Sequence, residues 1–312
     1  MSGVSMNRQA FISAGAVAMF GATPFGASAQ AAGGGTLSVR PTPGGALVTP
    51  SDKLFVYSQM RTPAQTPVNI QIDGLVENAT RFVASDLQNM PPAKEFQTFE
   101  CFVNTAGGPL IFTTEFAGVA LSGLLQKARP KPQARAALIE TYDGHPPFLL
   151  PLTELQRPGT MLVATIGGQQ APHEHGGPYT KLFIPGAGGN HNPKWVSHIT
   201  LVSDEAPEHP APPMAGFLFP SPPETVGALA GVTLSGYAFA GPERVGSVEL
   251  STDNGATYQR MPLWAQPDPY LWMTWDVTWR PPQRGFYVLR VRATSARGAK
   301  QDVPGVIAVE VR

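Results

Sequence analysis

Alternation of apolar and polar residues is the main pattern along this chain, and it predicts short β-strands. Val68, Ile70 and Ile72 alternate with polar neighbours and end at the Asp-Gly pair 73–74, which is typical of a strand followed by a turn. Near the C-terminus Tyr287, Leu289 and Val291 alternate in the same way, so we expect them to face a core. Further strands are predicted at 136–140, 148–152, 161–166, 182–185 and 196–202.

Helical signals are few and short. Residues 84–90, with Ser85 as the N-cap residue, run into Pro91 and Pro92, and residues 117–128 are stopped by Pro130. Glycine and proline number 33 each, a content that favours many turns and β-rich structure over helix bundles. We therefore predict an α+β protein whose sheets dominate.

A change in residue composition divides the chain into two predicted domains. Seven prolines fall between Asp204 and Pro223, so residues 205–223 are predicted to be a Pro-rich linker. After it come plain β-patterns, including a hairpin signal at Asp253-Asn254-Gly255. Several short strands in residues 224–312 predict an immunoglobulin-like β-sandwich. Residues 51–204 form the other domain, and residues 32–50, rich in Gly, Pro and Thr, are predicted to be a flexible lead-in.

The N-terminus has the pattern of an export signal. A short positive region ends at Arg8, an apolar stretch of small residues follows from Ala10 to Phe25, and Ala27-Ser28-Ala29 fits a cleavage site. We therefore predict a signal over residues 1–31, of the twin-arginine-like or Sec type, and a periplasmic or otherwise exported protein. The apolar stretch is too short and too broken by Gly and Pro for a membrane span, so none is expected after signal removal.

Charge and cysteine content exclude several functions. Lys+Arg and Asp+Glu are 22 each, a balance that gives no support to a nucleic-acid or polybasic membrane partner. A single cysteine excludes an internal disulfide, a four-cysteine zinc site, iron–sulfur ligation and the C-x-x-C-H haem attachment.

That single cysteine is the most informative residue. Cys101 is expected at the end of an extended segment, on a loop that continues through Asn104 to the pair Gly107-Gly108. A thiolate is a soft metal ligand and a strong nucleophile. The residues alone leave open a buried, inert cysteine, a zinc site with His173, His175 and His191, and a cysteine–histidine hydrolase. The Gly-rich loop 186–194, together with Lys181, His191 and Lys194, could meet an anion or could be a solvated turn.

The order of these motifs resembles the sulfite oxidase-like molybdenum enzymes. Cys101 with Asn104 is followed by Tyr142-Asp143-Gly144, then Glu174-His175-Gly176, and then Pro185-Gly186 with Gly189 and Lys194-Trp195. The resemblance covers about residues 51–204, and residues 224–312 resemble the dimerisation domain of this family. It implies the fold of a mixed, β-rich molybdopterin-binding domain followed by an immunoglobulin-like sandwich.

The resemblance also implies a cofactor and a set of residues. Molybdenum would be held by two dithiolene sulfurs of one molybdopterin and by the Cys101 thiolate, with Cys101 and Tyr57 as catalytic residues. Asp143, His175 and Lys194 match residues that hold the pterin and its phosphate. The remaining cofactor-binding residues implied by position are Ser58, Gln59, Asn104, Lys181, His191 and Asn192.

The chain departs from the family where sulfite oxidizers bind the substrate's charge. Tyr57 stands where they carry an arginine, Thr180 replaces a second arginine, and Phe116 replaces a tryptophan. An anion without its cationic partners in a low-dielectric pocket loses several kcal/mol. We therefore expect a substrate other than plain sulfite. Arg244 of the second domain could reach the site.

Together these features predict an exported molybdenum-cofactor oxidoreductase that transfers an oxygen atom with two electrons. The partners expected are a small-molecule substrate, a separate cytochrome as electron acceptor, and a second copy of the chain in a homodimer. The alternative is a cofactor-free binding or assembly protein on the same fold, which docks its partner through the β-sandwich.

Overall fold

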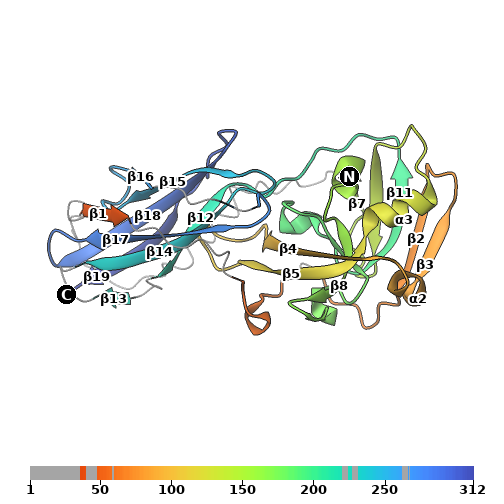
Figure 1. The fold of residues 1–312 in the computed structure, drawn as a ribbon, viewed down its shortest axis with the longest axis horizontal. Coiled ribbons are helices and arrows are strands. Elements are labelled where there is room, and N and C mark those ends of the chain that lie inside the picture. The colour runs from red at the N-terminus through yellow and green to blue at the C-terminus, as the bar shows by residue number, and fades with distance from the viewer. Residues whose placement is uncertain are drawn as a thin grey trace.

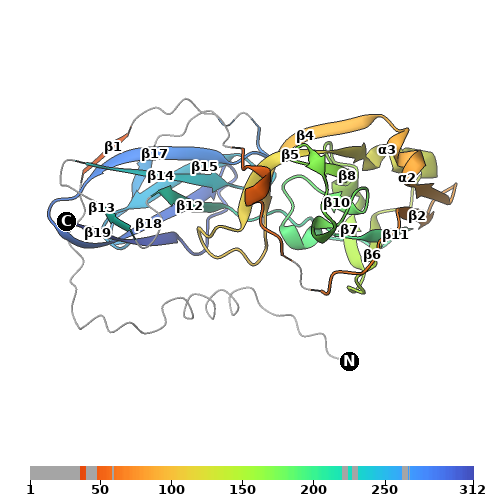
Figure 2. The ribbon, with the colours of Figure 1, turned by 90° about the horizontal axis from the view of Figure 1, so that it is seen from below.

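The computed structural model describes residues 36–39, 48–57, 60–219, 224–226, 231–261, 266 and 268–312. These residues form two lobes that lie side by side along the long axis of the molecule (Figure 1). The same arrangement is seen from below (Figure 2). The predicted export signal lies outside the described residues. No helix in the described part of the chain is both long and apolar enough to cross a membrane.

The N-terminal lobe is built on two sheets. The first has the strand order β10-β8-β5-β4, with β9 paired to β8, and the second has the order β3-β2-β11-β6-β7. All neighbours are antiparallel except β11 and β2. The strands are β2 (Asn69–Gly74), β3 (Thr80–Val83), β4 (Pro92–Glu100), β5 (Ile111–Ala120), β6 (Ala136–Thr141), β7 (Phe148–Pro151), β8 (Met161–Ile166), β9 (Gln169–Gln170), β10 (Lys181–Phe183) and β11 (Val196–Val202).

Short helices connect and cover these strands. Helix α3 (Leu121–Ala128) buries Leu121, Leu124, Leu125 and Ala128, which lie on one helical face. It ends at Arg129, whose left-handed backbone closes the last turn. The other helical segments are α2 (Ala84–Gln88), α4 (Leu152–Leu155) and the 3-10 turns η1 (Ser51–Lys53), η2 (His173–His175) and η3 (Gly189–His191).

Most predicted strands of this lobe are present, and one predicted helix begins later than expected. Residues 117–120 belong to the end of β5, and α3 begins only at Leu121. The prediction was wrong there because β5 is buried over most of its length, so its apolar residues do not alternate.

The C-terminal lobe is a two-sheet β-sandwich. One sheet has the order β1-β17-β14-β12 and the other the order β13-β19-β18-β15-β16. The strands are β1 (Thr36–Val39), β12 (Met214–Phe219), β13 (Glu224–Val226), β14 (Val232–Phe239), β15 (Val245–Ser251), β16 (Gln259–Met261), β17 (Met273–Arg280), β18 (Gly285–Ser295) and β19 (Gly305–Val311).

Residues of both sheets share one core in this sandwich. Leu234 and Val277 of one sheet pack in a cluster with Leu289 and Val309 of the other. The predicted alternation in β18 is confirmed, because Tyr287, Leu289 and Val291 are all buried. The predicted hairpin is also present, since β15 and β16 pair around the turn. Its immunoglobulin-like character stays a prediction.

Two predicted connecting segments contribute strands to the sandwich. Residues 36–39 of the predicted flexible lead-in form β1, which pairs antiparallel with β17. Within the predicted linker, residues 214–219 form β12, which pairs with β14. The linker was predicted from its proline content to continue through these residues to 223, although Met214–Phe219 itself contains no proline.

The two lobes are joined by main-chain contacts around the end of β4. The backbone N–H of Thr98 donates to the Tyr270 carbonyl at 2.9 Å, and the Trp272 N–H donates to Thr98 Oγ1 at 2.7 Å. The Tyr237 hydroxyl of β14 donates to the Gly108 carbonyl at 2.8 Å. The loop that follows Cys101 is therefore held from behind by the sandwich.

Glycines allow the closest approach between the lobes. Gly107 has φ +69°, and a Cβ at this position would lie 2.8 Å from Gly305 Cα and 3.1 Å from Gly216 Cα. Both neighbours are backbone atoms of sandwich strands, so neither can move aside cheaply. Only glycine meets both the left-handed backbone and the contact distance.

Replacing Gly107 with alanine is expected to destabilise the protein by about 2–4 kcal/mol, because a left-handed backbone and a backbone clash act together. The matched control is Gly144→Ala, since Gly144 has φ +75° with no atom within 4 Å of the added Cβ. That control should cost about 1 kcal/mol. Thermal unfolding monitored by circular dichroism measures both. Equal losses in the two variants would contradict the importance of the interlobe contact.

Candidate functional site

Cys101 directly follows β4, as the sequence predicted, and it lines a cavity. Its N–H donates to the Leu110 carbonyl at 3.0 Å, and its own carbonyl accepts the Asn104 N–H at 2.9 Å. These two bonds fix the backbone of the turn that carries the thiol. The side chain is only 4% exposed, and its sulfur faces a cavity of about 310 Å³.

The environment of the thiol keeps it protonated in the protein alone. Burial raises the pKa of Cys101, and the nearby Glu100 carboxylate adds to this. The Val103 backbone N–H and the Lys194 ammonium oppose the shift without cancelling it. A soft metal ion would displace this proton, because a metal binds the thiolate form.

The cavity brings together most of the residues that the sequence singled out. They come from four separate segments of the chain, which the two sheets and their loops place around Cys101. The predicted residues that line the cavity are Tyr57, Cys101, Asp143, His175, Lys181, His191, Asn192 and Lys194. Sequence positions up to 137 apart therefore meet at one site.

Two predicted residues that the structure describes, Asn104 and Arg244, do not line the cavity. Asn104 is buried on the sandwich side of the loop, where its amide donates to the Met214 sulfur at 3.2 Å. Ser58 and Gln59 lie outside the described residues. The Arg244 guanidinium does not line the cavity and donates instead to the Gln266 carbonyl.

The zinc site considered from the sequence is not formed. His173 does not line the cavity; one of its ring nitrogens lies 2.7 Å from the Pro63 carbonyl. Within the described ranges, no three His, Cys, Asp or Glu side chains gather closely enough to hold a metal ion. Cys101 is thus not part of such a cluster in the described part of the chain.

Lys181 is a buried cation at the cavity wall. The residue is 5% exposed, and its Nζ lies 5.0 Å from the centre of the Phe99 ring. Among the described residues, no Asp or Glu forms an ion pair with it. Burial, followed by repulsion from Lys194, lowers the pKa of Lys181 to about 7. Buried charges are normally paired with an opposite charge, so Lys181 lacks the anionic partner that its burial would call for.

Lys194 supplies a second cation, and it ties two segments together. Its Nζ donates to the Tyr57 carbonyl at 2.7 Å and to the Glu174 carbonyl at 2.8 Å. Burial lowers the pKa of Lys194 to about 8, against the opposing effects of Asp143, Cys101 and Glu174. The ammonium therefore holds the segment around Tyr57 over the cavity.

Two histidines at the same wall are uncharged at neutral pH. Burial lowers the pKa of His175 to about 4, with further repulsion from Lys181 and Lys194. Burial and His209 lower the pKa of His191 to about 4. All four basic groups are thus shifted in the direction expected of a site that needs a negative charge.

The loop 186–194 is shaped by the side-chain amide of Asn192 and by its glycines. Asn192 Oδ1 accepts the Ile184 N–H at 2.7 Å, while its Nδ2 donates to the carbonyls of Ala187 and Gly188. Asn192 therefore lines the cavity and also fixes the shape of the loop with its side-chain amide. A Cβ on Gly189 would lie 2.8 Å from the Glu100 carbonyl and 3.0 Å from Cys101 Cα. Glycine there lets the loop pass directly beside Cys101.

Sequence reasoning missed the aromatic wall of the cavity. Phe55, Phe99 and Phe112 pack with ring centroids 5.2–5.8 Å apart. They come from three segments, so no local pattern groups them. The sequence signalled this wall only through the aromatic residues themselves, without showing that they meet.

A half-buried pair of stacked histidines at the cavity was also missed. The His191 ring stacks on the His209 ring with centroids 3.5 Å apart. His209 in turn lies beside Glu154, which is fully buried. The His209 backbone N–H donates to Glu154 Oε1 at 2.8 Å, and His209 Nδ1 lies 3.7 Å from Glu154 Oε2. The Gly188 N–H donates to the His209 carbonyl at 3.0 Å. The predicted linker thus supports the cavity loop.

Replacing His209 with asparagine is expected to raise the pKa of His191 above about 4, because repulsion from His209 is lost. Burial is the larger cause and persists, so the value should remain below the ordinary 6.5. Nuclear magnetic resonance titration of the histidine rings measures the shift. His198→Asn, on the second sheet, serves as the control. An unchanged His191 would show that the stacked ring has no electrostatic effect.

The described residues fit a phosphate-bearing cofactor with a soft metal. A buried thiol could serve as the ligand of a soft metal, and a buried lysine without an ion pair could meet an anion. Glycine backbone brings the two close together. The aromatic wall provides an apolar surface for a flat ring system.

Comparison with known proteins identifies this arrangement. Residues 59–210 match the family described as the oxidoreductase molybdopterin binding domain. The chain is 31% identical over 155 residues to an NADPH nitrate reductase of Fusarium oxysporum, a match that covers 43% of this chain and 17% of that protein. It resembles the crystal structure of the sulfane dehydrogenase SoxCD from Paracoccus pantotrophus with a TM-score of 0.65 and 22% identity. That match covers 77% of this chain and 74% of the other, and it shows the fold.

The fold and the cavity therefore define a molybdopterin-binding oxidoreductase domain. These matches support a relation to the sulfite oxidase-like molybdopterin-dependent oxidoreductases, as the motif order indicated. The cofactor of this chain is molybdopterin with molybdenum. The chain spans only 17% of the length of the nitrate reductase that it matches.

Proposed function

We propose that this chain is an exported oxidoreductase that transfers an oxygen atom to or from a small molecule other than plain sulfite. The observation that supports this most directly is the cavity itself, in which the single cysteine faces basic groups that lack an anion. When bound, the molybdenum cofactor supplies the two-electron oxygen-atom chemistry.

The chain's own residues hold and shelter that cofactor. Cys101 provides the thiolate ligand to molybdenum. Lys181 and Lys194 face the anionic end, where burial makes each charge contact stronger than it would be in water, and the neutral His191 ring lines the same cavity. Asn192 and Gly189 shape the loop around this end. Tyr57 covers the cavity because Lys194 holds its carbonyl.

The substrate follows from the groups that surround the metal position. Tyr57 stands where sulfite oxidizers carry an arginine, and Thr180 is buried with its hydroxyl bonded to the Gly176 carbonyl, so it does not face the cavity. A sulfite dianion would have no bidentate guanidinium partner among the described lining residues. Electrons would leave to a separate cytochrome, and two copies of the chain would associate through immunoglobulin-like sandwiches.

Metal and pterin analysis of the mature protein tests this proposal. The protein is expressed in a host that makes molybdopterin and exports the product, and near-stoichiometric molybdenum with a phosphate-bearing pterin is expected. Absence of both in repeated preparations would instead support a cofactor-free binding protein. Zinc in place of molybdenum would show that Cys101 and the histidines were misassigned.

A further inference from the structure

The loop 186–194 is paired with the linker through its backbone. The Gly188 N–H donates to the His209 carbonyl at 3.0 Å, and the Ala211 N–H donates to the Gly186 carbonyl at 2.8 Å. These two bonds flank an isolated antiparallel bridge between the two segments. The position of the loop is therefore tied to that of the linker.

Side chains of helix α4 and of the turn after it hold both segments. Glu154 is fully buried, and its Oε1 accepts the His209 N–H at 2.8 Å. The Arg157 guanidinium donates to the carbonyl of Pro185, the residue before the loop, at 2.9 Å. It also lies 3.3 Å from the Glu208 carboxylate and 3.8 Å from that of Glu154. We call Glu154, Arg157, Glu208 and His209 the α4 clamp.

The buried charge of Glu154 is more than packing requires. A fully buried carboxylate is costly, and apolar residues of similar volume often stabilise a fold equally well. Glu154 Oε2 and His209 Nδ1 lie 3.7 Å apart, and neither atom has a hydrogen-bond partner among the described residues. Packing thus gives no reason for a carboxylate here. The bond to the linker backbone does, because an apolar side chain cannot accept the His209 N–H.

The clamp reaches the cavity only through the loop. Its four residues, all of which the structure describes, do not line the cavity, whereas residues 189–194 of the loop do. A Cβ on Gly189 would lie 3.0 Å from Cys101 Cα, so a small shift of the loop changes the space beside the thiol. The His191 ring, stacked on the His209 ring, adds a second contact between the cavity wall and the clamp.

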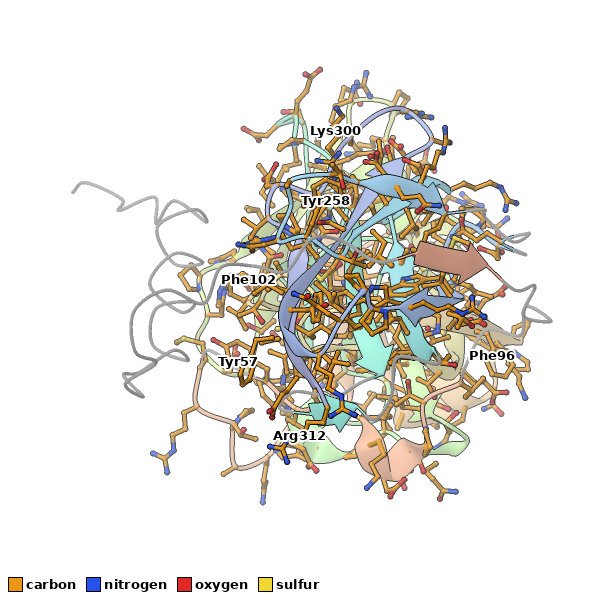
Figure 3. All side chains as sticks on the ribbon, turned by 90° about the vertical axis from the view of Figure 1, so that its left-hand side faces the viewer. Tyr57, Phe96, Phe102, Tyr258, Lys300 and Arg312 are labelled. Carbon is orange, nitrogen blue, oxygen red and sulfur yellow. The ribbon has the colours of Figure 1, made fainter. Side chains whose placement is uncertain are left out.

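The cavity opens to solvent away from the clamp. It reaches the surface at Tyr57 and Met60, which are 39% and 37% exposed. Tyr57 and Phe102 lie on the same side of the molecule (Figure 3). A bound group leaves through this opening, and the contacts that retain it come from buried residues such as Lys181 and from the loop.

We propose that Glu154 is a positioning residue for the bound cofactor, because through the α4 clamp it holds the loop 186–194 against the anionic end. This inference rests on the proposed function, since it concerns the same cavity. Without the Glu154 carboxylate the loop and the linker separate more often, and the cofactor leaves the cavity faster.

Hydrogen exchange on the cofactor-free protein tests the clamp by itself. The Gly188 and Ala211 amides should exchange about 10-fold faster in Glu154→Leu, because local opening frees both bonds. Glu154→Gln keeps an acceptor for the His209 N–H, so its rates should stay within about 3-fold of those of the unchanged protein. Amides of β2, in the other sheet, report the stability of the whole lobe and separate it from opening at the loop.

Cofactor loss from molybdenum-loaded protein tests the consequence. Molybdenum that remains bound is followed during dialysis. Loss should be about 10-fold faster in Glu154→Leu and nearly unchanged in Glu154→Gln, because removing the outer partners of a metal site weakens retention by about this factor. Glu115→Leu is the matched control, since the Glu115 side chain is 19% exposed, pairs with Lys94 at 2.7 Å and does not line the cavity. It should leave both measurements unchanged.

Arg157→Lys provides a second variant should Glu154→Leu fail to fold. It keeps a positive charge beside Glu154, but a lysine lacks the fork that bonds Pro185 and Glu208 together. The Gly188 and Ala211 amides should then exchange about 3-fold faster, again by local opening.

Each outcome decides the inference. Unchanged loop amides in Glu154→Leu, or in Arg157→Lys where that variant is used, would overturn the clamp. Faster exchange without faster cofactor loss would overturn its role in retention, and equal losses in Glu154→Gln and Glu154→Leu would overturn the role of the hydrogen bond. Absence of molybdenum from the unchanged protein would overturn the proposed function, whereas the exchange measurement would still decide the clamp.

Discussion

Replacing Cys101 with serine is expected to lower turnover by more than about 100-fold while the fold is preserved. Loss of residues that only support a metal ligand typically costs 10–100-fold, so loss of the ligand itself should exceed this range. A serine hydroxyl is a harder ligand and stays protonated near neutral pH, whereas the cysteine thiolate matches a soft metal. The measurement is the initial rate per molybdenum atom with a substrate that the unchanged protein turns over and an artificial electron acceptor.

The fold should survive this change because serine is smaller by a fraction of an ångström and keeps both backbone bonds of the turn. Thermal unfolding of Cys101→Ser should lie within a few degrees of the unchanged protein. Thr105→Ser, in the same loop, is the matched control and should retain full turnover. Turnover that persists in Cys101→Ser would show that the cysteine is a packing residue, as in a cofactor-free scaffold.

Replacing Lys181 with methionine is expected to stabilise the cofactor-free protein and to weaken cofactor retention. The lysine is buried without an anionic partner, and burial lowers its pKa to about 7. Keeping it charged below that pH therefore costs on the order of a few kcal/mol. Methionine fills a similar volume without charge, so the Tm of the cofactor-free protein should rise by about 5 °C near pH 6. Molybdenum content after purification should fall.

The pH dependence has a definite sign. An unfolded lysine holds its proton up to about pH 10.5, whereas folded Lys181 releases it near pH 7. Between these values the unfolded state binds more protons, so stability rises as pH rises. The cost of the charge is present in full below about pH 7 and disappears toward pH 10.5. Thermal unfolding at pH 6 and at pH 9 measures this slope.

Lys181→Met should remove most of the slope, with Lys194 contributing the remainder because its pKa is lowered to about 8. Lys127→Met is the control, since Lys127 lies exposed in the last turn of α3. An unchanged slope in Lys181→Met would mean that the lysine is hydrated in solution. Unchanged molybdenum content would mean that it does not meet the anionic end of the cofactor.

The strands were predictable where one face is buried and the other is solvated. In β2 and β18 this asymmetry appears in the sequence as an alternation of apolar and polar residues. In β5 it does not, because seven of its ten residues are buried and they include neighbours on both faces of the strand, and the start of α3 was misplaced as a result. The hairpin at Asp253-Asn254-Gly255 was predictable because its turn chemistry is local.

The cavity was predictable in part, and for a different reason. Cys101, Asp143, His175 and Lys194 belong to motifs whose order along the chain is informative, and they do line one cavity. The stack of His191 on His209 depends on the path of the linker, which no local pattern encodes. Asn104 belongs to the cysteine motif, yet its side chain faces Met214 because the loop turns toward the sandwich.

The position of the sandwich behind the cysteine loop limits how this protein can be divided. A fragment ending near residue 210 would carry the whole family-matched region but would leave Ile111 exposed, because this residue packs in a cluster with Tyr237 and Trp272. It would also lose the acceptors and donors that meet Thr98. The sandwich is thus a part of the metal site's frame rather than an interchangeable module. A domain from a relative could replace it only if glycines met Gly107 at the same distance.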